Sequence, residues 1–189
     1  MTGRASSEPA RPVPVVVVTG SESTGKTTLA ADLSRHFDGV VVPEFAREYA
    51  DRRIAATGLP LDATDVEPIA RGQIVLHDRA IASAPSLVVL DTDLVSTVVY
   101  AHHYYGSCPA WIEQAAVDRR GDLYLFCDID VPWVPGPHRD RPHARREIHA
   151  AFAAALVALG APVVDIRGGW SERFATAAGA VSALWPRAR

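Results

Sequence analysis

The stretch GSESTGKT, Gly20–Thr27, decides the fold of this chain. Its spacing, Gly-x-x-x-x-Gly-Lys-Thr, is the Walker A or P-loop pattern. It follows a largely β-branched, apolar run at Val13–Thr19, which is typical of a buried strand, and it precedes a helical pattern that starts near Lys26. A strand, a glycine-rich loop and a helix in this order distinguish a phosphate-binding loop from a chance match to the motif.

Lys26 is the only lysine of the chain, against eighteen arginines. A compact ammonium at this position reaches phosphate oxygens as a point charge, which a planar guanidinium does not replace. In such loops the backbone N–H groups cradle the phosphates, the lysine reaches the β- and γ-phosphates, and the Thr27 hydroxyl coordinates Mg²⁺. We therefore predict ATP and Mg²⁺ as cofactors. The predicted nucleotide-binding residues of the loop are Gly20, Ser21, Glu22, Ser23, Thr24, Gly25, Lys26, Thr27 and Thr28.

The composition is that of one globular domain: 189 residues, of which 48% are hydrophobic and 22% charged. A net charge of −3 gives no basic surface for nucleic acid, and the apolar runs are too short to span a bilayer. The two cysteines lack metal-binding spacing and fit a reduced, cytoplasmic protein. We expect residues 1–12 to be a disordered lead and residues 13–189 to be the P-loop domain. A small molecule is the expected partner, and a homo-oligomer is left open.

Apolar strand patterns alternate with helical patterns along the chain. Strands are predicted at 13–19, 40–43, 86–90, 122–128 and 162–166, and helices at 26–37, 45–56, 65–84, 94–105, 110–117, 143–159 and 171–184. Ser171 is the predicted N-cap of the last helix. This alternation predicts a three-layer α/β fold of the P-loop NTPase and kinase type, with a mainly parallel five-stranded sheet. The ligand should then lie at the carboxyl ends of the strands.

Acidic residues follow several of these strands. The segment LVVLDTD, Leu87–Asp93, is an apolar strand that ends in aspartate, which is the Walker B pattern. Asp91 is predicted to complete the metal site begun by Thr27, and both Asp91 and Asp93 are catalytic candidates. A helix N-cap at Asp93 is the alternative. We expect these acids to share one rim with the acids that follow the neighbouring strands, Glu44, Asp128 and Asp130.

The segment VVVPEFAREY, Val40–Tyr49, places Glu44 at a strand end. Arg47 and Glu48 follow at i+3 and i+4, on the same side of a predicted helix. A kinase that acts on a hydroxyl needs a carboxylate to accept or orient the proton, and Glu44 is placed for that role. The alternative is an ion-paired helix start, where acids are favoured by the helix dipole.

An arginine-rich segment follows CDIDVPWVPGP, Cys127–Pro137. In a small P-loop kinase such a segment is a lid whose guanidinium groups close over the phosphates and spread the transition-state charge. Arg139 is the catalytic candidate, and Arg141 and Arg145 are predicted to bind the nucleotide. The alternative is a solvated basic loop.

Taken together, these motifs resemble the ribosylnicotinamide kinase domain of the NadR family. The matching pieces, in order, are GSESTGKTTL, PEFAREY, LDTD followed by Thr97, and DLYLFCDIDVPWV with Arg139 downstream. The resemblance implies transfer of the ATP γ-phosphate to the 5′-hydroxyl of nicotinamide riboside, which gives the mononucleotide for NAD biosynthesis. The predicted substrate-binding residues are Glu44, Arg47, Asp93, Thr97 and Trp133.

One position departs from the family pattern. An aromatic residue that would stack on the pyridine often precedes the glutamate matched by Glu44, and here that position is Pro43. Trp133 or a tyrosine of the stretch 100–105 would have to take its place. Two alternatives stay open: a nucleotide or deoxynucleoside kinase with a different acceptor, and a regulatory P-loop ATPase.

Overall fold

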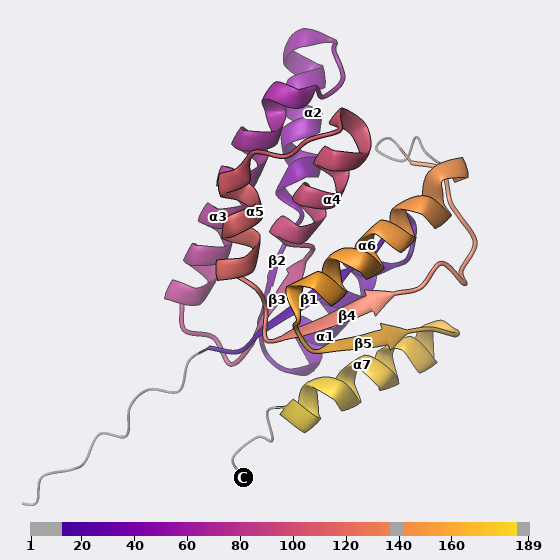
Figure 1. The fold of residues 1–189 in the computed structure, drawn as a ribbon. Helices are drawn as coiled ribbons and strands as arrows, with labels where there is room; N and C mark the ends of the chain where they lie inside the picture. Colours follow the sequence, from indigo (N-terminus) through magenta and orange to yellow (C-terminus); the bar gives the residue numbers. More distant parts are fainter. Residues whose placement is uncertain (1–12, 137–141, 185–189) are drawn as a thin grey trace, which may run out of the picture.

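The computed structural model describes residues 13–136 and 142–184 (Figure 1). Its five strands form one parallel sheet in the order β2-β3-β1-β4-β5. The strands are β1 (Val15–Thr19), β2 (Val40–Val42), β3 (Val88–Asp91), β4 (Leu123–Cys127) and β5 (Val163–Ile166). The parallel five-stranded sheet predicted from the sequence is confirmed. The predicted lead at residues 1–12 lies outside the described residues.

Helices cover both faces of the sheet, which makes three layers. The helices are α1 (Lys26–His36), α2 (Phe45–Thr57), α3 (Val66–Ala82), α4 (Leu94–Tyr105), α5 (Ala110–Asp118), α6 (Arg145–Leu159) and α7 (Trp170–Leu184), with 3₁₀ turns at Ala63–Asp65 and Pro142–Ala144. The helices α1 and α7 pack on one face, and α3, α4, α5 and α6 pack on the other (Figure 1). Over the described residues, no helix is both long enough and apolar enough to cross a membrane.

The central strand β1 shows why this sequence buries a sheet on both faces. Its side chains alternate: Val16 and Val18 pack toward α1 and α7, while Val15 and Val17 pack toward the other layer. Burying one valine side chain stabilises the fold by roughly 1.5 kcal/mol or more. The β-branched run therefore anchors the loop that follows it at the centre of the molecule.

Most predicted boundaries differ from the structure by one or two residues, and one predicted cap is wrong. The last helix begins at Trp170, so Ser171 lies inside it and is not its N-cap. The carboxylate of Glu172 accepts a hydrogen bond from the Gly169 N–H at 2.8 Å. The first N–H groups of a helix have no acceptor within it, and this bond satisfies one of them at the start of α7. The helix begins one residue ahead of the predicted serine.

The strand order reverses at β1, and in open parallel sheets such a reversal marks a ligand-binding crevice at the carboxyl ends of the strands. From β1 the chain moves to one side of the sheet for β2 and β3, and it then crosses to the other side for β4 and β5. Ligands of open parallel sheets bind where the strand order reverses in this way. The crevice is bordered by the ends of β3 and β4, the strands that pair with β1.

Candidate functional site

The loop between β1 and α1 has the backbone of a phosphate cradle. Gly20 and Gly25 adopt positive φ angles of 131° and 82°, and Ser23 is left-handed at 57°. A Cβ on Gly20 would lie 2.7 Å from the carbonyl oxygen of Cys127, so no other residue fits there without a shift. The loop opens directly onto the N-terminus of α1, whose free N–H groups attract anions.

Lys26 is the first residue of α1, and its side chain is buried within the loop. Its ammonium donates a hydrogen bond to the Ser21 carbonyl at 2.8 Å. Burial lowers the pKa of Lys26, while the carboxylates of Glu44 and Asp91 act in the opposite direction. The predicted lysine and two of the predicted acids therefore lie within electrostatic reach of one another.

Thr27 and Asp91 make the direct contact expected of a Walker A and Walker B pair. The Thr27 hydroxyl donates to one carboxylate oxygen of Asp91 at 2.6 Å. The other carboxylate oxygen is buried and has no hydrogen-bond partner among the described residues. Mg²⁺ favours a few hard oxygen ligands and keeps the rest of its shell as water and phosphate oxygens. The two side chains fit that ion, and their binding of Mg²⁺ stays a prediction.

A cluster of three or more His, Cys, Asp or Glu side chains suited to a metal is absent from the described part of the chain. An ion that arrives with the phosphates of a nucleotide does not need such a cluster.

Glu44 and Arg47 extend this contact across the crevice. The Arg47 guanidinium pairs with the Glu44 carboxylate at 2.7 Å and donates to the Thr27 hydroxyl at 3.1 Å. Glu44 occupies the N-cap position of α2, yet its side chain makes no capping bond. The polar contacts thus form an unbroken line from Asp91 through Thr27 and Arg47 to Glu44. The predicted ion pair at the start of the helix is present within that line.

Asp93 is oriented differently from the expectation that it faces the crevice with Asp91. One of its carboxylate oxygens accepts from the Val95 N–H at 3.1 Å and caps α4, and the other accepts from the Tyr124 hydroxyl at 2.6 Å. Burial raises the pKa of Asp93 to about 6. The N-cap alternative is therefore the observed one. A role for Asp93 in substrate binding or catalysis stays a prediction.

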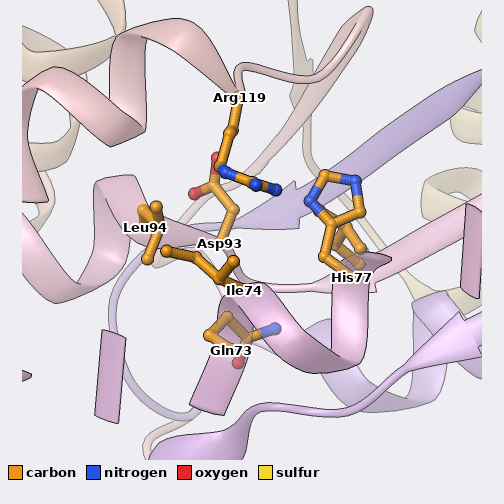
Figure 2. A pocket seen from close by; sticks show the side chains of 7 residues that line it. Gln73, Ile74, His77, Asp93, Leu94 and Arg119 are labelled. Carbon is orange, nitrogen blue, oxygen red and sulfur yellow. The ribbon is translucent and has the colours of Figure 1, made fainter. Parts of the chain in front are cut away.

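The Asp93 side chain lines a small cavity between α3, α4 and α5 (Figure 2). His77 and Arg119 lie around the same cavity, whose lining includes no residue of the phosphate loop. Asp93 is followed immediately by α4, so its carboxylate is held by the N–H groups of that helix. Thr97, one helical turn later, lies half-buried on α4, and its predicted contact with substrate also stays a prediction.

The two acids that follow β4 are both paired with arginines. Asp128 pairs with Arg167 at 2.7 Å and lies 3.5 Å from His149. Asp130 pairs with Arg173, which also contacts the phosphate loop at Thr24. Their convergence on one rim with Glu44 and Asp91 stays a prediction.

Arg145, at the start of α6, contacts the phosphate loop. It donates to the backbone carbonyls of Val131 at 2.8 Å and Ser23 at 3.1 Å. The Val134 N–H in turn donates to the Ser23 hydroxyl at 2.8 Å. The segment that carries Trp133 therefore rests on the tip of the phosphate loop.

Contacts of Arg145 and Trp133 with nucleotide or substrate stay predictions. Arg139 and Arg141, predicted for the lid, lie outside the described residues. Their roles stay predictions as well.

Two residues near the loop had no signal in the sequence. Arg173 of α7 is only 2% exposed and donates to the carbonyls of Thr24 at 3.2 Å and Gly168 at 2.9 Å, besides its pair with Asp130. It is one of eighteen arginines, and only the fold brings it to the loop. The ring of Trp170 lies against Gly25, where an added Cβ would come within 2.4 Å of it.

A family model described as an AAA domain matches residues 15–173. The chain belongs to this family. The match runs from β1 to Arg173 and so includes the phosphate loop, both acids beside it and the buried arginine. The AAA-domain assignment agrees with the phosphate-binding loop, with the buried Lys26 and with the Thr27–Asp91 contact described above.

The chain is similar to the trifunctional NAD biosynthesis/regulator protein NadR of Escherichia coli strain K12. The two are 29% identical over 122 residues, which are 65% of this chain and 30% of NadR. The matched part therefore spans less than a third of that relative.

Solved structures give the same result. The crystal structure of NadR protein in complex with NR superposes with a TM-score of 0.78 at 29% identity, over 91% of this chain and 51% of the other. NadR in complex with NAD and AMP-PNP gives a TM-score of 0.72 at 29% identity, over 91% and 49%. Thymidylate kinase from Ehrlichia chaffeensis superposes with a TM-score of 0.64 at 15% identity, over 92% of this chain and 100% of the other. At that identity, the likeness shows the fold alone. The P-loop kinase fold and the resemblance to NadR are both confirmed.

Proposed function

We propose that this chain is an ATP-dependent kinase that phosphorylates the 5′-hydroxyl of nicotinamide riboside and so produces the mononucleotide. The observation that carries the proposal is the unbroken line of contacts from Asp91 through Thr27 and Arg47 to Glu44, directly beside Lys26. One end of that line is suited to a nucleotide with its metal ion. The other end presents a carboxylate to an acceptor.

The residues divide the reaction between them. The loop N–H groups and Lys26 hold the phosphates, and Thr27 and Asp91 would hold Mg²⁺, which would supply charge neutralisation there. Glu44 accepts the proton of the acceptor hydroxyl. The hydroxyl oxygen forms a bond to the γ-phosphorus as the bond from that phosphorus to the β,γ-bridging oxygen breaks, and ADP leaves. Arg47, released from Glu44 and Thr27, is free to bind the transferred phosphoryl group.

The comparisons support both ligands of this proposal. NadR, to which the chain is 29% identical, has been crystallised with NR and with AMP-PNP, and those structures superpose on 91% of this chain. The chain matches only 30% of NadR in sequence, so the other activities in that protein's name are not carried over.

Aromatic residues of α4 support a planar base near Glu44. Burial raises the pKa of Tyr100 well above its ordinary value, and the negative charge of Glu44 adds to the shift, so Tyr100 lies within electrostatic reach of that acid. Tyr100 stacks on Tyr104 with ring centroids 6.0 Å apart. Trp133, by contrast, lies near the loop tip. We propose that Tyr100 takes over the stacking role lost at Pro43.

The test is a coupled assay of ADP release with nicotinamide riboside, thymidine, thymidylate and no acceptor. We expect the highest kcat/KM with nicotinamide riboside, and mass spectrometry should show the mononucleotide. Faster turnover with thymidine or thymidylate would replace the proposal with a nucleoside or nucleotide kinase. ADP release that no acceptor accelerates would leave a regulatory ATPase. We place the enzyme in the cytoplasm, in keeping with its two free cysteines.

A further inference from the structure

Glu44 lies on a connection that its own neighbouring elements hold weakly. The strand before it, β2, is three residues long and lies at the sheet edge, with Val40 and Val41 exposed. The helix after it, α2, has only Ala50 fully buried. A carboxylate that must meet a hydroxyl at hydrogen-bond distance needs a firmer support than these two elements give.

That support comes from α3, 28 residues further along the chain. The side-chain oxygen of Gln73 accepts from the Phe45 N–H at 2.8 Å, and its amide nitrogen donates to the Pro43 carbonyl at 3.4 Å. One side chain therefore grips the backbone on both sides of Glu44. Gln73 is 5% exposed, so water competes little for these bonds. In Figure 2 it lies apart from Arg119 and His77, at the other end of the cavity.

The Glu44 side chain is not used to cap its own helix. An acid at an N-cap position normally accepts from the N–H of the second or third helical residue. Gln73 instead accepts from the N–H of Phe45, the first helical residue, which an N-cap side chain does not bind. The Glu44 carboxylate makes no capping bond and is directed to Arg47 instead.

Gly72 completes the contact. A Cβ at this position would lie 2.0 Å from the ring of Phe45, so the ring packs directly on the backbone of α3. Glycine is a poor helix former, and a glycine inside a helix often marks such a close approach. Phe45 is thus held by its ring at Gly72 and by its N–H at Gln73.

We infer that Gln73 and Gly72 are positioning residues that fix Glu44 for proton transfer. The inference rests on the proposed role of Glu44 in the kinase reaction. Neither residue reaches the phosphates, so their effect should appear in the acceptor step and not in nucleotide binding.

The test compares Gln73→Met, which keeps the length of the side chain, with Gln114→Met. Gln114 makes its bond to Asp118 on the exposed side of α5. We expect kcat with nicotinamide riboside to fall about 10- to 100-fold in Gln73→Met, as a misplaced catalytic group causes. The KM for ATP and the rate of ATP hydrolysis without acceptor should stay within twofold. Gln114→Met should match the wild type in all three.

A second pair of variants tests the glycine. Gly72→Ala should reproduce the loss of kcat, whereas Gly179→Ala in α7 should not, because a Cβ at Gly179 meets no atom within 4 Å. Full kcat in Gln73→Met, or a loss of ATP binding in proportion to kcat, would overturn the inference. The first result would show that Glu44 needs no support from α3, and the second would show general damage to the fold.

Hydrogen exchange of the Phe45 amide separates this inference from the proposed function. Exchange should be faster in Gln73→Met than in the wild type, and it does not depend on the identity of the acceptor. If the wild-type chain phosphorylates no nicotinamide riboside, the proposed function fails, and the exchange rate still decides whether Gln73 holds this segment. Unchanged exchange would reject the positioning role whatever the substrate is.

Discussion

The two sides of the phosphate loop are built in opposite ways. On the acceptor flank, which comprises Glu44, Arg47 and α2, only Ala50 of the helix is buried. On the donor flank, which comprises Arg145, Trp170, Arg173 and the chain around them, α7 buries Arg173 together with Ala177 and Val181. A well-packed donor flank and a lightly packed acceptor flank suit an enzyme that holds a nucleotide in a fixed frame and closes on a second substrate.

Arg173 shows how the donor flank is fixed. Its guanidinium joins the loop at Thr24, the chain after β5 at Gly168 and the acid Asp130 after β4. A buried cation with this many acceptors is strongly oriented, and no shorter side chain would reach all of them. On the acceptor flank, Arg53 of α2 bonds to Pro60, Asp62 and Asp65, but it is more exposed than Arg173. The ion pair between Glu44 and Arg47 on that flank is partly exposed.

The largest expected effect is on kcat and comes from Lys26, which lies in the phosphate loop between the two flanks. Lys26→Ala should lower kcat by about 1,000-fold or more, because no other ammonium exists in the chain to stabilise the transferred charge. The helical circular-dichroism signal should be retained, since α1 keeps its other contacts with the sheet. Arg35→Ala, an exposed position on the same helix, is the control in the coupled assay. Wild-type turnover in Lys26→Ala would remove the phosphate loop from the reaction.

The next effect belongs to the acceptor flank. Glu44→Gln should lower kcat by about 100- to 10,000-fold, since the amide cannot accept the proton. ATP affinity, measured by calorimetry, should change little, because the nucleotide is held from the other side. Glu48→Gln, an exposed acid one position beyond Arg47, is the matched control. Equal losses of kcat and ATP affinity would show that the two flanks do not act separately.

The sequence predicted the acceptor flank better than the donor flank, for a physical reason. Asp91 ends β3 and Glu44 lies two residues beyond β2, and parallel strands end on the same edge, so the position of both acids follows from chain order. Arg173 reaches the loop across 149 residues of sequence, and nothing in its neighbours distinguishes it from the other arginines. Tertiary contacts of this kind are decided by helix packing, which a linear pattern does not record.

Asp93 illustrates the limit of the strand-end rule. Asp91 is the last residue of β3 and Asp93 lies two residues beyond it, yet only Asp91 contacts the loop. Thr92 between them has a positive φ of 70°, so the backbone turns sharply before α4 begins. The pattern LDTD predicts acids at the strand end, but that local turn decides which of them contacts Thr27.

On the donor flank, Arg173→Met should destabilise the fold and weaken ATP binding together. We expect a loss of about 2 kcal/mol in the free energy of unfolding, because the buried carbonyls of Thr24 and Gly168 lose their donor. Urea unfolding and calorimetry with ATP measure the two effects. Arg167→Met, whose side chain is largely exposed, is the control. If Arg173→Met is as stable as the wild type and keeps its ATP affinity, Arg173 does not fix the donor flank for nucleotide binding.

Trp170→Ala tests the same difference between the donor and acceptor flanks, with a smaller expected effect on the KM for ATP. The ring lies against Gly25 and is 61% exposed, so it offers a free aromatic face beside the phosphate loop. Loss of a stacking face should raise the KM for ATP about 3- to 10-fold, with kcat at saturation unchanged. The KM for nicotinamide riboside should also stay constant, because the acceptor approaches from the Glu44 side. A change in the acceptor KM alone would place the acceptor on the donor flank.

The smallest effect concerns α3, the helix that supports the acceptor flank. Burial lowers the pKa of His77 below its ordinary value, Arg119 lowers it further, and Asp78 opposes the shift. The unfolded chain therefore binds a proton at His77 at a higher pH than the folded chain does. The contribution of neutral His77 to stability is present above pH 6.5 and is lost as the pH falls below it. Urea unfolding at pH 7.5 and 5.5 should show a smaller drop for His77→Gln than for the wild type. Equal drops in the free energy of unfolding would show that His77 has the same pKa in the folded and unfolded chain. Acid would then not destabilise α3 through His77.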